Sequence, residues 1–380
     1  MNKYKWSKYY IFMFIFLMYF IPKYFEYTTY MNLKGVAPVI SLMKLGAYAL
    51  ALVWWSINIL VPRKIPIYYY LIAVILLIYF TYEAFIKDRN NIFVVLLFSL
   101  IFEENYINKY IKDVLNISIF LYGLTIISCL CGAIENVYTD RNKFGSVWTG
   151  GGWGFEYSGQ LVMMLMPIVF LYYYKKGNRI KWYDNLFWII VNILVFMLCR
   201  TIMGFGLIML FIVLFNGVEI FKKKGIKTIF DKRYIRVCPY FCAIATGVML
   251  LLYKNHSGIG IKLDSVLNGR LSLGISMMEK YGVSMLGTSF VNSTDPAYEI
   301  LDSEYMHMLV GEGIIYLLIA LVLCQFLLTY SQKKKDIYLT LIYVLMMFNA
   351  MFNNGIFNLV MNPFGIVLAV SIKKALRKTC

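Results

Sequence analysis

The sequence contains few charged residues and few histidines, and each shortage excludes a class of protein. Only 15% of its 380 residues are charged, whereas 61% are apolar and the mean hydropathy is +0.67. An average soluble domain is about one quarter charged, so a water-soluble globular protein is excluded. The two histidines, His256 and His307, are too few for a histidine-rich metal centre.

The sequence also lacks the motifs of nucleotide chemistry and of disulfide-stabilised folds. It has no phosphate-binding loop, no nucleotide-binding domain and no repeat of fixed period. None of its seven cysteines forms a CxxC pair, and six of them stand in or beside apolar runs, which predicts small buried hydrophobic residues. Any activity is therefore expected in or beside a membrane, without a cytoplasmic motor domain.

Apolar runs separated by short basic clusters predict an all-α, polytopic membrane protein, a single domain over residues 1–380 with about twelve transmembrane helices. The first run begins after Lys8 and is followed by IPKYFEYTTY, which lacks a small-residue cleavage site, so we expect an uncleaved span. The predicted spans lie near residues 9–25, 40–61, 66–85, 91–103, 115–134, 159–174, 185–199, 203–220, 237–253, 306–330, 337–352 and 355–372.

The net charge of +17 is distributed as a topology signal. Lysine and arginine occur in short clusters between apolar runs, such as KKGNRIK, QKKKD and KKALRK, and not on one soluble face. With a cytoplasmic N-terminus, about 25 of the 37 basic residues fall on the inner side. We therefore expect both termini in the cytoplasm, membrane lipid as a partner and no nucleic acid.

Two predicted outer segments are long and polar. Residues 135–158 form a loop rich in aromatic residues and glycine, and residues 254–305 form the only sizeable hydrophilic region of the sequence. Within the second, residues 263–281 contain no proline and predict one amphipathic helix. At 100° per residue Arg270 falls on its apolar arc, where a guanidinium would meet a lipid-linked phosphate. The alternative is an ordinary surface arginine at the edge of the polar stripe.

Arg200 stands between the predicted spans 185–199 and 203–220, at the outer end of a helix. An ionisable residue at membrane depth usually faces a polar cavity, which makes Arg200 a functional candidate. The alternative is an arginine that extends to lipid headgroups.

Asp302, Glu304 and His307 lie within six residues at the start of the tenth predicted span. If a helix begins near Ser303, Glu304 and His307 share a face, where a carboxylate and an imidazole can take a proton from a hydroxyl group. A helix N-terminus rich in acidic residues is an equally economical explanation for Asp302 and Glu304.

The loop 135–158 supplies candidate substrate-binding residues, because aromatic rings stack on sugar faces and basic groups bind anions. The alternative is that the aromatic residues anchor the loop at the bilayer interface. The candidates are Arg141, Lys143, Trp148, Trp153 and Tyr157.

Four segments give the chain a resemblance to a known family. They are LCRTIMGFG around Arg200, NGRLSLGISMMEKYGVSMLGTS around Arg270, DSEYMHMLVGEGII from Asp302, and GFEYSGQL before the sixth span. Together with the order of the parts, they resemble the Wzy-type bacterial polysaccharide polymerases and the related O-antigen ligases. Asp302 stands near the place where the ligases have a histidine, which favours a polymerase. The HPN element of the family is absent.

The resemblance implies a metal-independent membrane glycosyltransferase of GT-C-like fold, without a cofactor, in the bacterial cytoplasmic membrane. Its donor would be an oligosaccharide linked to a polyprenyl pyrophosphate such as undecaprenyl pyrophosphate, and its product a capsule, exopolysaccharide or O-antigen chain. Arg200 and Arg270 would bind the pyrophosphate, because guanidinium groups bind phosphate oxygens as a planar fork. Asp302, Glu304 or His307 would assist deprotonation. A flippase and a chain-length regulator are the expected protein partners.

Two other functions remain open at the level of sequence. A flippase or transporter of lipid-linked saccharide would also suit about twelve spans, although residues 1–190 and 191–380 show no similarity of the kind found in repeated transporter halves. A ligase would differ only in its acceptor.

Overall fold

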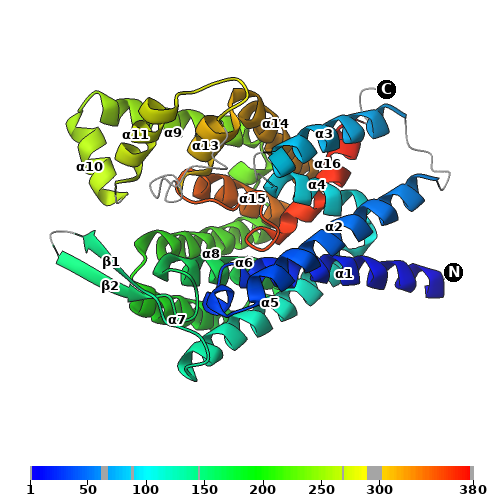
Figure 1. Ribbon diagram of the computed structural model, residues 1–380, viewed down its shortest axis with the longest axis horizontal. Helices are drawn as coiled ribbons and strands as arrows, with labels where there is room; N and C mark the ends of the chain where they lie inside the picture. The colour runs from blue at the N-terminus through cyan, green and yellow to red at the C-terminus, as the bar shows by residue number, and fades with distance from the viewer. Residues whose placement is uncertain are drawn as a thin grey trace.

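The computed structural model describes residues 2–60, 67–86, 90–143, 146–267, 269–288 and 302–376 and is mostly helical (Figure 1). The helices are α1 (Asn2–Phe25), α2 (Val36–Leu60), α3 (Ile67–Ile86), α4 (Asn91–Ile101), α5 (Ile107–Leu130), α6 (Ser158–Lys176), α7 (Trp182–Cys199), α8 (Ile202–Lys223), α9 (Cys238–Lys254), α10 (Gly258–Val266), α11 (Arg270–Tyr281), α13 (Glu304–His307), α14 (Ile314–Lys333), α15 (Ile337–Asn349) and α16 (Leu368–Leu376). The strands are β1 (Tyr138–Lys143) and β2 (Ser146–Gly151).

Six helical segments in the described part of the chain are long and apolar enough to cross a membrane. They are Val36–Asn58, Glu104–Leu130, Trp182–Cys199, Ile202–Lys223, Arg233–Lys254 and Ile314–Lys333, and each coincides with a predicted span. Large apolar side chains on their outward faces, such as Leu42, Phe120 and Ile244, are more than 60% exposed. Apolar faces of this length need lipid to cover them, which identifies a membrane-embedded helical protein.

The other six predicted spans are not among these segments. Three coincide with shorter apolar helices, Tyr69–Phe85, Asn91–Ile101 and Ile337–Asn349. Two coincide with α1 and α6, and the last, 355–372, is not one helix.

Residues 350–362 run through the interior without helical structure, and a continuous span over 355–372 is therefore a wrong prediction. Side chains replace the missing helical hydrogen bonds here. The Oδ1 atom of Asn358 accepts from the backbone of Val360 at 2.9 Å, and Asn362 donates to the carbonyl of Ile356 at 2.7 Å. Gly355, with φ 141°, makes the turn possible. Irregular backbone at membrane depth requires this kind of internal pairing.

The loop expected over 135–158 contains an antiparallel hairpin, in which Tyr138 pairs with Gly151 and Lys143 with Ser146. The predicted all-α, mostly helical fold is confirmed, and this two-stranded hairpin is an exception to it within the described residues. The hairpin packs on the end of α7, where Gly150 lies so close to the carbonyl of Cys199 that a Cβ atom would overlap with it. The glycine run thus permits close backbone contact.

Aromatic residues of α1 form a large part of the core. Phe12, Phe16 and Phe20 recur at every fourth position and are at most 1% exposed. The ring of Phe16 lies 5.8 Å from that of Phe98 in α4 and 5.3 Å from that of Tyr110 in α5, both edge-to-face. α1 is therefore fixed against α4 and α5.

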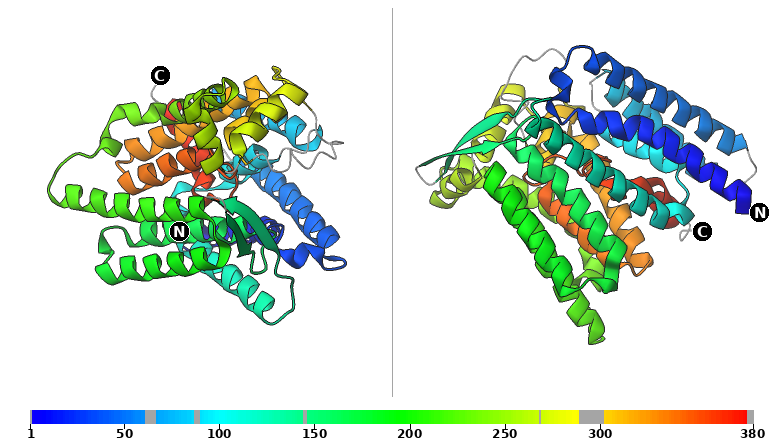
Figure 2. Two further views of the ribbon diagram at one scale, coloured as in Figure 1. Left: turned by 90° about the vertical axis from the view of Figure 1, so that its left-hand side faces the viewer. Right: turned by 90° about the horizontal axis from the view of Figure 1, so that it is seen from below.

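The molecule has two distinct ends. Both chain termini lie at one end, which we call the terminal end, whereas the hairpin and helices α10 and α11 lie at the other, which we call the hairpin end (Figures 1 and 2). Near the C-terminus, Glu104 forms ion pairs with Lys334 and Lys374.

We expect Gly204→Ala to destabilise the protein, because Gly204 of α8 faces Val162 of α6 and a Cβ atom would lie within 2.9 Å of its Cγ2 atom. Val162 is fully buried and cannot move aside. Overpacking of this kind costs about 1–3 kcal/mol. Gly206→Ala is the matched control, because a Cβ atom there meets nothing within 4 Å and the change favours the helix by up to ~1 kcal/mol. Thermal unfolding in detergent would measure both; equal melting temperatures would contradict the close α6–α8 contact.

Candidate functional site

Residues 263–281 form two helices and not the single amphipathic helix predicted from their periodicity. α10 ends at Val266, α11 begins at Arg270, and Gly269 between them has φ 77°. The Oδ1 atom of Asp264 accepts hydrogen bonds from the backbone N–H groups of Leu271 at 2.8 Å and Ser272 at 3.0 Å. Asp264 therefore caps the first turn of α11, and a glycine allows the sharp change of direction.

Arg270 is the first residue of α11 and lies on the buried side of that helix. Gly274 and Met277, one and two turns further on, are buried. The guanidinium binds Asp302, with Nε at 3.0 Å and Nη2 at 2.7 Å from the same carboxylate oxygen. Nη2 also donates to the side-chain oxygen of Asn353 at 3.3 Å. These contacts fix the orientation of the guanidinium plane.

The third nitrogen of Arg270, Nη1, is buried and makes no hydrogen bond with a described residue. The arginine side chain is 18% exposed and that of Asp302 is 35% exposed. One edge of the guanidinium is therefore bound to Asp302, while Nη1 is buried and has no hydrogen-bond partner among the described residues. A buried N–H donor of this kind favours an anionic acceptor.

The carboxylate of Glu304 is buried and bound to backbone. Its Oε2 atom accepts from the N–H groups of Gly355 and, at 2.9 Å, of Ile356. Burial raises the pKa of Glu304 above its ordinary value, and the field of Glu312 adds to this, while the two backbone donors and His307 oppose it. Glu304 thus fixes the middle of the irregular segment 350–362.

A π-helical turn, Met308–Glu312, follows α13 and is held by the chain after α11. Thr288 donates from its backbone N–H to the carbonyl of Gly311 at 3.0 Å, and Ile314 donates to that of Ser284 at 3.1 Å. Gly287 and Gly313 lie so close together that a Cβ atom on either would overlap with the other strand of backbone. The glycines on both sides of Glu312 therefore allow the crossing that fixes its position.

His307 and Glu312 face one polar cavity. The Nδ1 atom of His307 lies 3.3 Å from a carboxylate oxygen of Glu312. The cavity has a volume of about 340 Å³ and is lined by Lys23, Glu26, Lys44, Asn90, Asn91, His307, Glu312 and Tyr316. Four helices, α1, α2, α4 and α14, supply its walls together with the α13–π turn.

Lys23, Glu26 and Lys44 are functional candidates that the sequence analysis missed. Glu26 forms ion pairs with both lysines, at 2.7 Å with Lys23. Lys23 and Lys44 stand inside the predicted spans 9–25 and 40–61. A charged residue within an apolar run is the signal that could have identified them.

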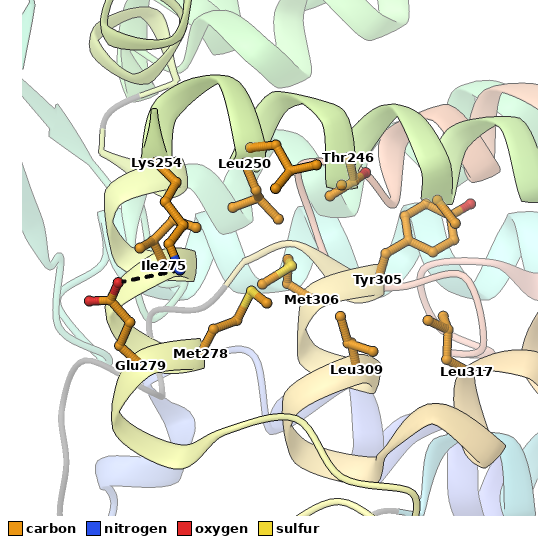
Figure 3. Close-up of a pocket in the computed structure, with 13 residues that line it drawn as sticks. Thr246, Leu250, Lys254, Ile275, Met278, Glu279, Tyr305, Met306, Leu309 and Leu317 are labelled. Atoms are coloured by element: carbon orange, nitrogen blue, oxygen red, sulfur yellow. Dashed lines mark ion pairs between the residues drawn. The ribbon is translucent and has the colours of Figure 1, made fainter. Parts of the chain in front are cut away.

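An apolar groove of about 260 Å³ lies beside α13 (Figure 3). Leu250 of α9, Met278 of α11 and Met306 of α13 contribute to its walls, and Leu317 of α14 lies at the far end. Lys254 and Glu279 stand 3.9 Å apart at one edge. The groove thus combines an apolar interior with a charged rim, which is the pattern of a site for an apolar chain with a polar head.

Arg200 is the residue that ends α7 in a left-handed conformation, with φ 53° and ψ 32°. Its side chain is exposed and forms no ion pair with a described residue. The contact of Gly150 with Cys199 places it beside the base of the hairpin. No described contact joins it to Arg270, so the structure brings Arg270 and Asp302 together but leaves Arg200 apart from them.

The aromatic candidates of residues 135–158 occupy different environments. Trp148 of β2 donates from its indole nitrogen to Ser146 at 2.9 Å and is half-buried. Trp153 packs against the core with φ 50°, and its backbone N–H donates to the side-chain oxygen of Asn136 at 2.8 Å. Tyr157 is 40% exposed. The backbones of Arg141 and Lys143 lie in β1, but their side chains lie outside the described part of the structure.

No three His, Cys, Asp or Glu side chains of the described residues lie together as a metal site would require. No family model, no curated protein and no solved structure matches this chain.

Glu304→Gln should make stability less dependent on pH. Because the pKa of Glu304 is raised above the ordinary 4.5, its contribution to stability is complete below about that pH and is lost as the pH rises through the folded-state pKa. Glutamine keeps an acceptor for Gly355 and Ile356 without the charge. Glu304→Ala should instead cost about 1–3 kcal/mol, because two buried N–H groups lose their partner. Melting temperatures from pH 4 to 8 would test this; parallel curves for wild type and Glu304→Gln would count against it.

Proposed function

We propose that this protein polymerises oligosaccharide repeat units linked to a polyprenyl pyrophosphate, at the outer face of the bacterial cytoplasmic membrane. The observation that supports this most is the position of Arg270. Arg270 is the first residue of α11, and other residues of α11 line the apolar groove. Its partly buried guanidinium binds Asp302, which lies just before the short helix α13. His307, the last residue of α13, lines the polar cavity. A lipid diphosphate that carries a saccharide needs these three environments side by side.

The proposal includes a topology of about twelve membrane crossings, of which the last, over 355–372, is not a continuous helix, with both termini in the cytoplasm. The position of both termini at one end of the molecule supports it, as do the basic residues there, such as Lys334 and Lys374. The hairpin end would then face outward, with residues 254–305 as the large outer segment. Residues 289–301 of that segment lie outside the described part of the structure.

In the proposed reaction, a hydroxyl oxygen of the acceptor attacks the anomeric carbon of the donor. The new glycosidic C–O bond forms as the C–O bond to the pyrophosphate breaks, and the polyprenyl pyrophosphate leaves with the bonding electron pair. Nη1 of Arg270 binds a phosphate oxygen while Asp302 holds the opposite edge of the guanidinium. This stabilises the charge that develops on the leaving group.

The proton of the attacking hydroxyl passes to His307 in this scheme. Glu312 faces Nδ1 of that imidazole and stabilises its protonated form. Glu304 acts as a positioning residue, because its carboxylate is bound to the backbone of residues 355 and 356. Arg200, which lies beside the hairpin and apart from Arg270, would contact the saccharide. The groove would hold the first isoprene units.

The decisive experiment uses purified protein and lipid-linked repeat units, without nucleotide and without an ion gradient. A ladder of longer lipid-linked products would support a polymerase. Translocation of unchanged substrate across a vesicle membrane would identify a flippase instead. Transfer of a finished glycan to a lipid acceptor, without a ladder, would identify a ligase.

Arg270→Ala should reduce the rate of ladder formation on the order of 100-fold, the usual cost of one donor to a developing anion. Arg270→Lys should also fail, because an ammonium cannot bind Asp302 and phosphate at once in a planar fork. Arg179→Ala, at an exposed position after α6, is the matched control and should keep normal activity. Turnover and membrane content would be measured together; wild-type rates in Arg270→Ala would exclude the phosphate role.

Gly247→Phe should block the groove without disturbing the fold. Gly247 lines the groove, and a Cβ atom there meets nothing within 4 Å. Gly217→Phe in α8 is the matched control, because its Cβ position is equally open and lies outside the groove. We expect the KM for lipid-linked substrate to rise at least about tenfold in Gly247→Phe alone, since buried apolar contact with the lipid is lost. Equal KM values in the two variants would remove the groove from the substrate site.

A further inference from the structure

The polar cavity contains two lysines that the proposed transfer step does not use. The side chains of Lys23 and Lys44 are only 14% and 16% exposed. Lysine at such a position is costly in an apolar surrounding unless it meets negative charge. One carboxylate, that of Glu26, is shared between both.

Because they share one carboxylate, Lys23, Lys44 and Glu26 together carry one net positive charge. Burial alone would raise the pKa of Glu26, but Lys23 and Lys44 hold it below its ordinary value, so Glu26 stays ionised. Two ammonium groups and one carboxylate then sum to +1. The carboxylate of Glu312 lines the same cavity and adds one negative charge, which faces Nδ1 of the His307 imidazole at 3.3 Å.

The rest of the lining suits a saccharide. Asn90, Asn91 and Tyr316 provide amide and phenol groups. The first turn of α4 begins at Asn91, and its backbone N–H groups form the positive end of an eleven-residue helix. A volume of about 340 Å³ lies within the range of small-molecule sites.

We propose that this cavity binds an anionic substituent, a carboxylate or a phosphate group, on the saccharide of a substrate. The assignment of that substrate as the acceptor rests on the proposed function. The position of the cavity agrees with this role. His307, in its wall, ends the single-turn helix α13, and Asp302, the partner of Arg270, lies just before that helix. The repeat unit would therefore be acidic.

Binding to the protein in lipid nanodiscs tests this independently of turnover. The probes are a fluorescent tetrasaccharide of alternating glucuronic acid and N-acetylglucosamine, its carboxyl-reduced neutral form, glucose 6-phosphate and inorganic pyrophosphate. We expect the acidic tetrasaccharide or the sugar phosphate to bind at least about tenfold more tightly than the neutral form, the scale of one charge-assisted hydrogen bond. Whichever of the two binds identifies the anion.

Two variants should shift this preference in opposite directions. Lys44→Gln should remove it, whereas Glu26→Gln should strengthen it, because both ammonium groups are then released. Because the two variants shift the binding preference in opposite directions, either variant alone tests the proposal if the other is unstable. Lys224→Gln, an exposed lysine after α8, is the matched control for loss of one charge and should change nothing.

The outcomes separate this inference from the proposed function. Equal binding of acidic and neutral saccharides, or a preference that Lys44→Gln leaves intact, would overturn the inference while a product ladder still supported the polymerase. Pyrophosphate binding that depends on Lys44, without any preference among saccharides, would assign the cavity to a lipid diphosphate and also overturn it. If the preference for the acidic saccharide depends on Lys44 but no product ladder forms, the acidic-saccharide site is retained and the polymerase is rejected.

Discussion

The buried carboxylate of Glu304 joins two parts of the chain on which the hairpin end depends. It accepts hydrogen bonds from the backbone of Gly355 and Ile356, where the chain has left helix α15 and runs irregularly through the interior. Backbone groups in an apolar environment must be paired, and without helical bonds they need side chains. Asn353, from the same segment, reaches Arg270. The arginine, its aspartate and the irregular segment are thus one connected unit.

Much of the helical fold could be predicted from apolar runs, because a span must be long and apolar and both properties are visible in the sequence. The same rule failed for residues 355–372, since apolar composition predicts burial and not helix. Gly355, Pro363 and the repeated asparagines were the local signs of irregular backbone. The break before α11 was less visible, because the apolar periodicity continues through it and the cap comes from Asp264, seven residues before Leu271.

The candidate site was predicted in part, for a geometric reason. Asp302, Glu304 and His307 are neighbours in sequence, but Asp302 lies before α13 whereas Glu304 and His307 lie at the two ends of that single turn. Asp302 therefore binds Arg270, Glu304 binds backbone, and His307 faces Glu312. Their partners come from α11, the irregular segment and the π turn, and no spacing in the sequence predicts those long-range contacts. Lys23 and Lys44 were visible as charges inside apolar runs, although nothing local placed them together.

The two cavities beside α13 impose a direction on any substrate that occupies both. The groove is lined by leucine, isoleucine and methionine side chains, whereas the polar cavity contains lysine, glutamate, histidine and asparagine. An amphipathic molecule would place its hydrocarbon in the first and its polar part toward the second, because the reverse would bury charge against apolar walls. Asp302, which binds Arg270, lies just before α13, and residues of α13 line both cavities. A diphosphate that joins lipid to sugar likewise separates a hydrocarbon end from a polar end. The close backbone crossing at Gly287 and Gly313 fixes the position of Glu312 in the wall of the polar cavity, without a side chain that could move aside.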